Sequence, residues 1–409
     1  MKKVLVALCL VLSLCVVMSC AALADAREAE YLNVKYGIAD FGAQADLESF
    51  NAALEALGVE PVEAETLTLA DATVAAVRLA GMEELALSYI HDDAPQKAAE
   101  VLAAENVSVA DEYAPYVACA LDLDLVDDDA DFAAAPSGEV ADEMLYRAAE
   151  IAGKARRYVG RVDDDDILPR LNTVLSTMII FDNEKLSDLG SEIVLSGAAT
   201  GYNLKYDGYD ANFLPEYTLK YGHSDLRHAL QLVALLDSEG FDAYIQIEPK
   251  VSVYEYMIEW GEPGEPTSTY AVRQVSDDRY LAYAAEYDML LEFDTVEEKE
   301  AFHALVETYA KRYDDSYDAD GNLTEKLITG AWWQPLYSST TVMQNDEFAE
   351  MVDNVVRFDG YSIHPFSLPE GTDAVAAVVA DKEPELSVEP QTIYVNPAFY
   401  RYTLGTDHQ

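Results

Sequence analysis

The residues of this chain that could carry chemistry gather around Ser224. His223 precedes it directly, and His228 follows four residues later, one turn away if the segment is a helix. A serine becomes a nucleophile only beside a base, and histidine serves as that base near neutral pH. The pattern therefore allows a hydrolase or an acyl-transfer enzyme. The competing interpretation is structural: Ser224 caps a helix, and the two histidines are surface or core groups.

A second candidate is a loop of oxygen-bearing side chains. Asp318, Asp320 and Asn322 have part of the spacing of an EF-hand calcium loop. The bidentate Glu that completes such a loop is missing, because its position is occupied by Leu327. An ordinary turn between helices is rich in the same residue types. Calcium is thus the one cofactor that these residues suggest, and a calcium-stabilised adhesin is the function that would follow.

Aromatic side chains form a third group. The chain has 27 Tyr, and Trp332 and Trp333 begin a compact aromatic run. Exposed aromatic rings stack against sugars and peptides, while neighbouring polar groups supply hydrogen bonds. The two tryptophans are therefore candidate ligand-binding residues. Packing in the core of a mixed domain would explain the same run.

Composition restricts the partners. The 409 residues include 76 acidic and 26 basic side chains, for a formal net charge of -50. This charge argues against nucleic acid and anionic lipid as partners, since both require a basic surface. Half of the residues are hydrophobic, so packed cores are expected, and the length predicts two or three domains.

The N-terminus predicts export. Two lysines at positions 2 and 3 precede an apolar run to about Met18, which is too short to cross a bilayer with ease. Small residues follow, so residues 1–24 are expected to be a signal peptide cleaved after Ala24. The alternative is a lipoprotein acylated at Cys20. No later segment is apolar for long enough to span a membrane, and the protein is expected to be secreted or held at the cell surface.

The region between residues 36 and 180 has apolar residues at helical spacing. One scheme occurs twice: a helix, an acidic loop, and a second helix that ends at Gly81 in the first copy and at Gly153 in the second. A third, weaker copy is expected to begin near Arg161. Helical hairpins repeated in this way must pack on one another to bury their apolar faces.

This scheme resembles the S-layer homology (SLH) repeats of bacterial surface proteins. The resemblance implies an all-α module that anchors the protein to cell-wall polysaccharide. At the start of its second helix the family has Thr-Arg-Ala-Glu, in which the Arg contacts the polymer. The matching runs here, 68–71 and 140–143, lack that cation. Helix capping alone would explain a Thr or an Asp there. The ligand-binding candidates that the resemblance marks are Thr68, Asp71, Asp142 and Glu143.

From residue 188 onward, Tyr, Asp, Pro and β-branched residues increase, which predicts a separate mixed α/β domain over 188–409. Spacing predicts helices at 226–237 and 297–311 and strands at 241–248, 288–293 and 391–395. The run from Tyr221 to Tyr244 resembles the core of transglutaminase-like cysteine enzymes. Ser224 stands where that family has its Cys, and the family's following His has no counterpart. The resemblance thus implies a non-catalytic domain used for binding or structure.

The predicted fold is multidomain: all-α SLH-like helical repeats at 36–180, followed by a mixed α/β (α+β) domain. The predicted function is that of an exported cell-envelope protein that associates with wall polysaccharide and carries a non-catalytic binding or structural domain. A surface hydrolase or acyl-transfer enzyme and a calcium-stabilised adhesin are the alternatives.

Overall fold

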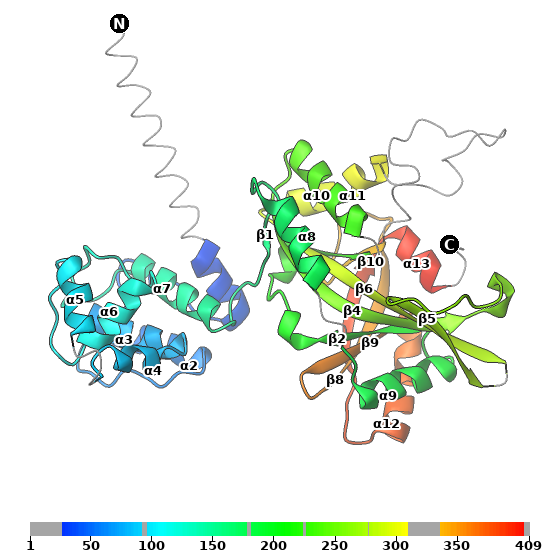
Figure 1. Cartoon of the computed structure of the whole chain (residues 1–409), viewed down its shortest axis with the longest axis horizontal. Helices are drawn as coiled ribbons and strands as arrows, with labels where there is room; N and C mark the ends of the chain where they lie inside the picture. Colours follow the sequence, from blue (N-terminus) through cyan, green and yellow to red (C-terminus); the bar gives the residue numbers. More distant parts are fainter. Residues whose placement is uncertain are drawn as a thin grey trace, which may run out of the picture. The chain divides into compact units, whose positions relative to one another are not determined.

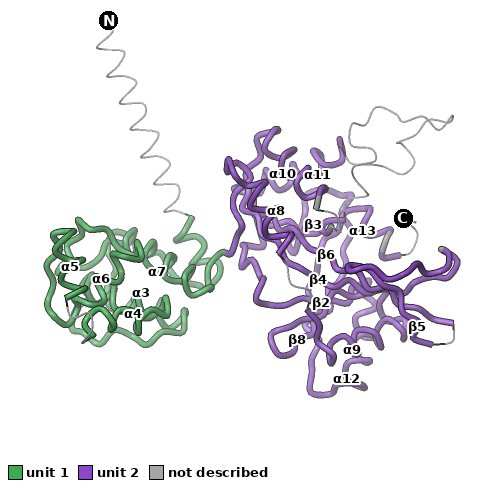
Figure 2. The backbone as a smooth tube through the Cα atoms, in the orientation of Figure 1, with its two compact units in different colours: residues 1–156 green, residues 157–409 purple. Residues whose placement is uncertain are grey.

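The computed structural model describes residues 27–404, with gaps at 92–95, 178–180, 224–225, 277 and 310–335. The chain divides into two compact units, residues 1–156 and 157–409 (Figure 2). This boundary lies earlier in the chain than the expected one near 180. The segment expected as a third helical repeat is α8 (Ile167–Thr177), and it packs in the largest apolar core of the second unit through Ile167 and Leu171.

The first unit is helical throughout its described residues. Central to it is α3, which packs against both α6 and α7 and is rich in buried alanines that allow a close approach. The helices are residues 27–36, α2 (Leu47–Ala56), α3 (Leu69–Leu79), α4 (Glu83–Ser88), α5 (Lys97–Ala104), α6 (Ala114–Asp122) and α7 (Gly138–Ile151) (Figure 1).

Short-range capping determines where the main helices of this unit begin. Thr68 caps α3 and forms a reciprocal capping box with Asp71. Ser137 caps α7, so residues 140–143 lie inside this helix and not at its start, where they were expected. Gly138 opens α7 because a Cβ there would lie 2.0 Å from the Gly42 carbonyl oxygen.

The second unit is built on one antiparallel sheet of ten strands. Eight of them close into a barrel in the order β4-β2-β9-β8-β10-β7-β3-β6, because β6 pairs back with β4. β1 and β5 pair with β4 and β6 outside this ring. The strands are β1 (Gly160–Arg161), β2 (Gly201–Tyr206), β3 (Thr218–His223), β4 (Ala243–Tyr256), β5 (Tyr270–Ser276), β6 (Arg279–Phe293), β7 (Leu336–Ser339), β8 (Ala349–Phe358), β9 (Tyr361–Ser367) and β10 (Glu389–Val395).

The barrel consists of two halves with related topology. One half runs β3, α10 (Leu226–Ser238), β4, β6, α11 (Val296–Tyr309) and β7, with strand order β7-β3-β6-β4. This is the split βαβ arrangement. The other half has the order β10-β8-β9-β2. Its elements come from two separate segments of the chain. The first segment supplies α9 (Glu184–Leu195) and β2, and the last supplies β8, β9, α12 (Thr372–Lys382) and β10. Closure therefore depends on pairing between β2 and β9, which are far apart in the sequence.

Each half buries an apolar core between the outer face of its strands and its helices. α8, α10 and α11 cover one core, and α9 and α12 cover the other on the opposite side of the barrel (Figure 1). A small apolar cluster at one end of the interior packs against α13 (Pro397–Thr403). Single 3-10 turns are η1 (Asp207–Tyr209), η2 (Pro215–Tyr217), η3 (Ile258–Trp260) and η4 (Pro369–Gly371).

The expected fold of helical repeats followed by a mixed α/β (α+β) domain is wrong in its second part. The C-terminal region is a closed antiparallel barrel with helices on its outside. The predicted strands at 241–248 and 288–293 are only the ends of β4 and β6, which pair along their whole length. No strand was expected over the rest of β4 and β6, residues 249–256 and 279–287.

Candidate functional site on the inner face of the barrel

The middle of the barrel interior is lined by charged side chains. Residues along a strand alternate between its two faces. On β4 and β6, Ile247 and Met289 lie in the outer core, so their neighbours Glu248 and Asp288 face the interior. We call the inward charged and polar set the inner charge cluster: Lys205, Lys220, Lys250, Glu248, Asp288, Asp353, Ser362 and His364.

Asp288 is at the centre of the ionic part of this cluster. It is 3% exposed. Its Oδ2 accepts from Lys205 Nζ at 2.5 Å, and its Oδ1 accepts from Lys250 Nζ at 2.8 Å. Burial by itself would raise the pKa of Asp288, but the charges of Lys205, Lys250 and Lys220 hold it well below its usual range. Both oxygens of this buried carboxylate therefore have cationic partners.

Lys205 is shared between two carboxylates. Besides Asp288, its Nζ donates to Glu248 Oε2 at 2.9 Å. Burial acts to lower the pKa of Lys205, but the coulombic effects of Asp288 and Glu248 outweigh it and raise the pKa. The two carboxylates therefore stabilise the charged form of Lys205. The two cations and two carboxylates of this group are therefore paired with one another: Lys205, Lys250, Asp288 and Glu248.

A line of hydrogen bonds leads from the interior toward the surface. Asp353 Oδ2 lies 2.9 Å from His364 Nδ1, and His364 Nε2 lies 3.1 Å from Ser362 Oγ. This is the order of an Asp-His-Ser triad. Ser362 is 2% exposed, however, and its hydroxyl also donates to Asp207 Oδ1 at 3.1 Å. The line therefore orients the Asp353 carboxylate rather than activating the serine.

Two groups of the inner charge cluster are left without partners among the described residues. Asp353 is 4% exposed, and its Oδ1 accepts no hydrogen bond from them. Lys220 is half-buried, and its Nζ forms no hydrogen bond or ion pair with them. The two groups interact electrostatically. Burial would raise the pKa of Asp353, but His364, Lys220 and Lys205 lower it. Asp353 is therefore ionised with one oxygen free.

A separate buried polar group on α11 also escaped the sequence analysis. Lys299 is 1% exposed, and its Nζ donates to the Glu216 carbonyl oxygen and to Thr341 Oγ1, both at 2.7 Å. Burial lowers the pKa of Lys299 to about 8, against the opposing charges of Glu300 and Glu216. These two neutral acceptors hold the amine in place, which assigns it a structural role.

The predicted catalytic and metal residues are only partly described. Ser224 lies outside the described residues, as do Trp332, Trp333, Asp318, Asp320 and Asn322. His223 is the last residue of β3, and its side chain is not among those described. His228 is half-buried in α10. The serine hydrolase and the calcium loop therefore remain predictions.

Three of the four residues that the SLH resemblance marked have protein partners. Thr68 and Asp71 form the capping box of α3, and Tyr113 Oη donates to Asp71 Oδ1 at 2.7 Å. Glu143 pairs with Arg147 one turn along α7. Asp142 differs, since it is 6% exposed, and burial together with the charge of Asp40 raises its pKa to about 7.

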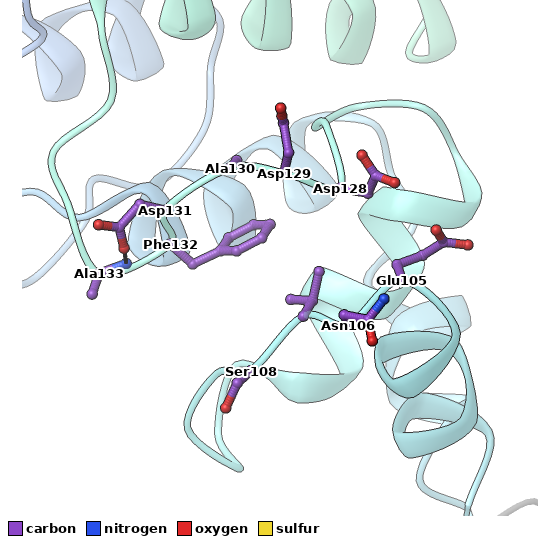
Figure 3. Close-up of a pocket in the computed structure, with 10 residues that line it drawn as sticks. Glu105, Asn106, Ser108, Asp128, Asp129, Ala130, Asp131, Phe132 and Ala133 are labelled. Atoms are coloured by element: carbon purple, nitrogen blue, oxygen red, sulfur yellow. Dashed lines mark hydrogen bonds between the residues drawn. The ribbon is translucent and has the colours of Figure 1, made fainter.

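The first unit also contains a hollow of about 390 Å³ between residues 105–108 and 128–133 (Figure 3). Phe132 reaches from one loop toward the other. The carboxylates that line the hollow are Glu105, Asp128, Asp129 and Asp131. Its acidic character favours a neutral or cationic ligand over an anionic one.

Searches of protein families, of curated proteins and of solved structures find no match to this chain. Within the described ranges, no three or more His, Cys, Asp or Glu side chains are grouped so as to hold a metal ion. Over the same ranges, none of the helices is both long enough and apolar enough to cross a bilayer.

Proposed function

We propose that this protein is exported and retained at the cell envelope, where the second unit binds a small polar molecule on the inner face of its barrel. The observation that carries the binding function is Asp353 Oδ1, which is buried and has no hydrogen-bond partner among the described residues. A buried polar atom without a partner costs about 1–3 kcal/mol. A ligand that supplies the missing donor would offset this cost.

The size of the barrel limits the ligand. An eight-stranded barrel is wide enough to be filled by side chains or to hold one small molecule. Polar residues occupy the middle of this interior, while apolar clusters occupy other parts of it. The ligand is therefore expected to be small and hydrophilic, not a lipid or a polymer.

Thermal unfolding followed by tryptophan fluorescence tests the binding function. All three Trp residues, at 260, 332 and 333, lie within the sequence range of the second unit, so the helical unit contributes no tryptophan signal. A panel of small anions, cations, zwitterions and neutral sugars is added to the mature full-length chain. At least one class should raise the melting temperature of wild type and leave that of Lys220→Met unchanged. A panel without any such class contradicts the proposal.

Retention at the envelope is proposed for the first unit. Its support is the repeated helix–loop–helix scheme, with α3 started by the Thr68–Asp71 capping box. The polymer contact would differ from that of typical SLH repeats because the basic residue is missing. We expect cosedimentation of residues 25–156 with purified wall sacculi, lost when the secondary polymer is stripped from the wall. Residues 157–409 serve as the matched control and should stay in solution.

The alternative route to retention is acylation at Cys20. Cys20→Ala in the full chain distinguishes acylation from wall binding by the first unit. Loss of the protein from the cell envelope, together with failure of residues 25–156 to pellet, would replace wall binding with a lipid anchor.

A further inference from the structure

The charges of the inner charge cluster divide into those that are matched and those that are not. Lys205, Lys250 and Asp288 form one mutually paired set, with Glu248 as its fourth member. Lys220 Nζ and Asp353 Oδ1 have no hydrogen-bond or ion-pair partner in the described part of the chain. One cation and one carboxylate oxygen are thus left available on the same inner surface.

We infer that this pair of groups recognises a zwitterion of amino-acid size, with the ligand's ammonium group on Asp353 Oδ1 and its carboxylate on Lys220 Nζ. The inference rests on the proposed binding function and specifies its ligand class. Each ligand charge meets an opposite protein charge, and the complex buries no additional net charge.

Asp353 is held in a receptive orientation. Its Oδ2 is occupied by His364 Nδ1 at 2.9 Å, and His364 Nε2 is in turn 3.1 Å from Ser362 Oγ. Only Oδ1 remains for a ligand. A buried, ionised carboxylate oxygen is a strong acceptor for N⁺–H donors, since charge-assisted hydrogen bonds are about twice as strong as neutral ones.

Lys220 is free because of its place in the sheet. Its register neighbours are Leu290 on β6 and Ser338 on β7, and neither is charged. Lys250, in contrast, lies opposite Glu286 and contacts Asp288. Lys220 therefore has no carboxylate directly opposite it in the ladder. Its ammonium is available to a ligand carboxylate, as a point charge with three donors.

Simple ions fit this site less well than a zwitterion. An anion on Lys220 would be repelled by the carboxylates of Asp353 and Asp288. Burial raises the pKa of both carboxylates, and the charge of Lys220 acts in the opposite direction. A cation on Asp353 would be repelled by the positive charges of Lys220 and Lys205. Burial raises the pKa of Asp353, and these two charges act in the opposite direction. A ligand with both charges cancels the two repulsions.

Isothermal titration of the mature full-length chain tests the inference with glycine, L-alanine and D-alanine as probes. Acetate and methylammonium, which each carry one half of the zwitterion, are titrated at equal concentrations. The zwitterions should bind, and each half should bind at least about tenfold more weakly. Lys220→Met and Asp353→Asn should each weaken the zwitterion by about tenfold or more. Lys382→Met, which removes a surface ion pair on α12, should leave affinity unchanged.

The possible failures are distinguishable. Binding of acetate or methylammonium as tightly as glycine would overturn the zwitterion while leaving a polar-ligand barrel. Absence of binding by every probe, including those of the thermal panel, would overturn the proposed function itself. Lys220→Met removes no hydrogen bond or ion pair within the described residues, so it keeps the test valid even where Asp353→Asn fails to fold.

Discussion

The two units of this protein use charge in opposite ways. In the helical unit, Asp71 forms a capping box with Thr68 and Glu143 pairs with Arg147, each within one turn of a helix. In the barrel interior, the paired charges are buried and come from different strands, with Lys250 and Asp288 separated by 38 positions. Local pairs define helix ends, whereas these buried pairs form only when the strands are in register.

This difference predicts different energetic consequences. An exposed pair on a helix contributes a few tenths of a kcal/mol, because water already solvates both partners. Breaking a buried pair leaves a charge that water does not reach, and costs about 3–5 kcal/mol. Four predictions, made with five substitutions, test how the two units differ, and they are given in order of decreasing effect.

Asp288→Asn should have the largest effect. The substitution preserves shape but leaves Lys205 and Lys250 without a buried anion. The free energy of unfolding of the barrel should fall by about 3–5 kcal/mol, measured by urea denaturation with tryptophan fluorescence. A loss below about 1 kcal/mol would show that the inner ion pairs do not hold the barrel closed.

Close backbone packing should matter in both units. A Cβ at Gly138 would lie 2.0 Å from the Gly42 carbonyl oxygen, and one at Gly190 would lie 2.6 Å from the Tyr202 ring. Gly138→Ala and Gly190→Ala should each cost about 1–3 kcal/mol. Circular dichroism of residues 25–156 reports the first and tryptophan fluorescence the second. Gly264→Ala, where no atom lies within 4 Å, is the control that should change neither.

Asp142→Asn should stabilise the helical unit in a pH-dependent way. Burial and Asp40 raise the pKa of Asp142 from 3.8 to about 7, so the folded state prefers the protonated form. Stability from this group is fully present below pH 3.8 and is lost as the pH rises to about 7. At pH 8 the variant should gain about 1–3 kcal/mol, and at pH 3.5 nothing. An equal gain at both pH values would exclude titration as the cause.

Glu143→Gln should have the smallest effect. Its pair with Arg147 lies on the surface of α7, and both side chains are about a third exposed, at 31% and 39%. The free energy of unfolding of residues 25–156, measured by thermal unfolding, should change by less than about 0.5 kcal/mol. A loss comparable to that of Asp288→Asn would remove the contrast between local and long-range pairing.

Much of the secondary structure was predictable from the sequence. The helix expected at 226–237 is α10, the one expected at 297–311 is α11, and the late strand at 391–395 lies within β10. These segments have clear periodicity. The helix caps were also readable, because Thr68 and its partner Asp71 are only three positions apart.

The candidate site was not predictable, because its members come from six strands. Lys205, Lys220 and Asp353 each look like an ordinary polar residue in an alternating strand. Alternation shows that the two faces of a strand differ, but it does not show which face is inside. In this barrel the apolar face points outward beneath helices and the polar face points inward, which reverses the usual expectation.

The helical character of the first unit, the acidic charge, the cap positions and the strand periods can be read from the amino-acid sequence, since all of these depend on composition or on residues within one turn of each other. The pairing of β6 with β4 and of β2 with β9, and so the choice of enclosed charges, emerges only in the folded chain. Closure of the barrel depends on contacts between segments that are distant in the sequence. A buried ion pair acquires its energy only after that closure has removed the water.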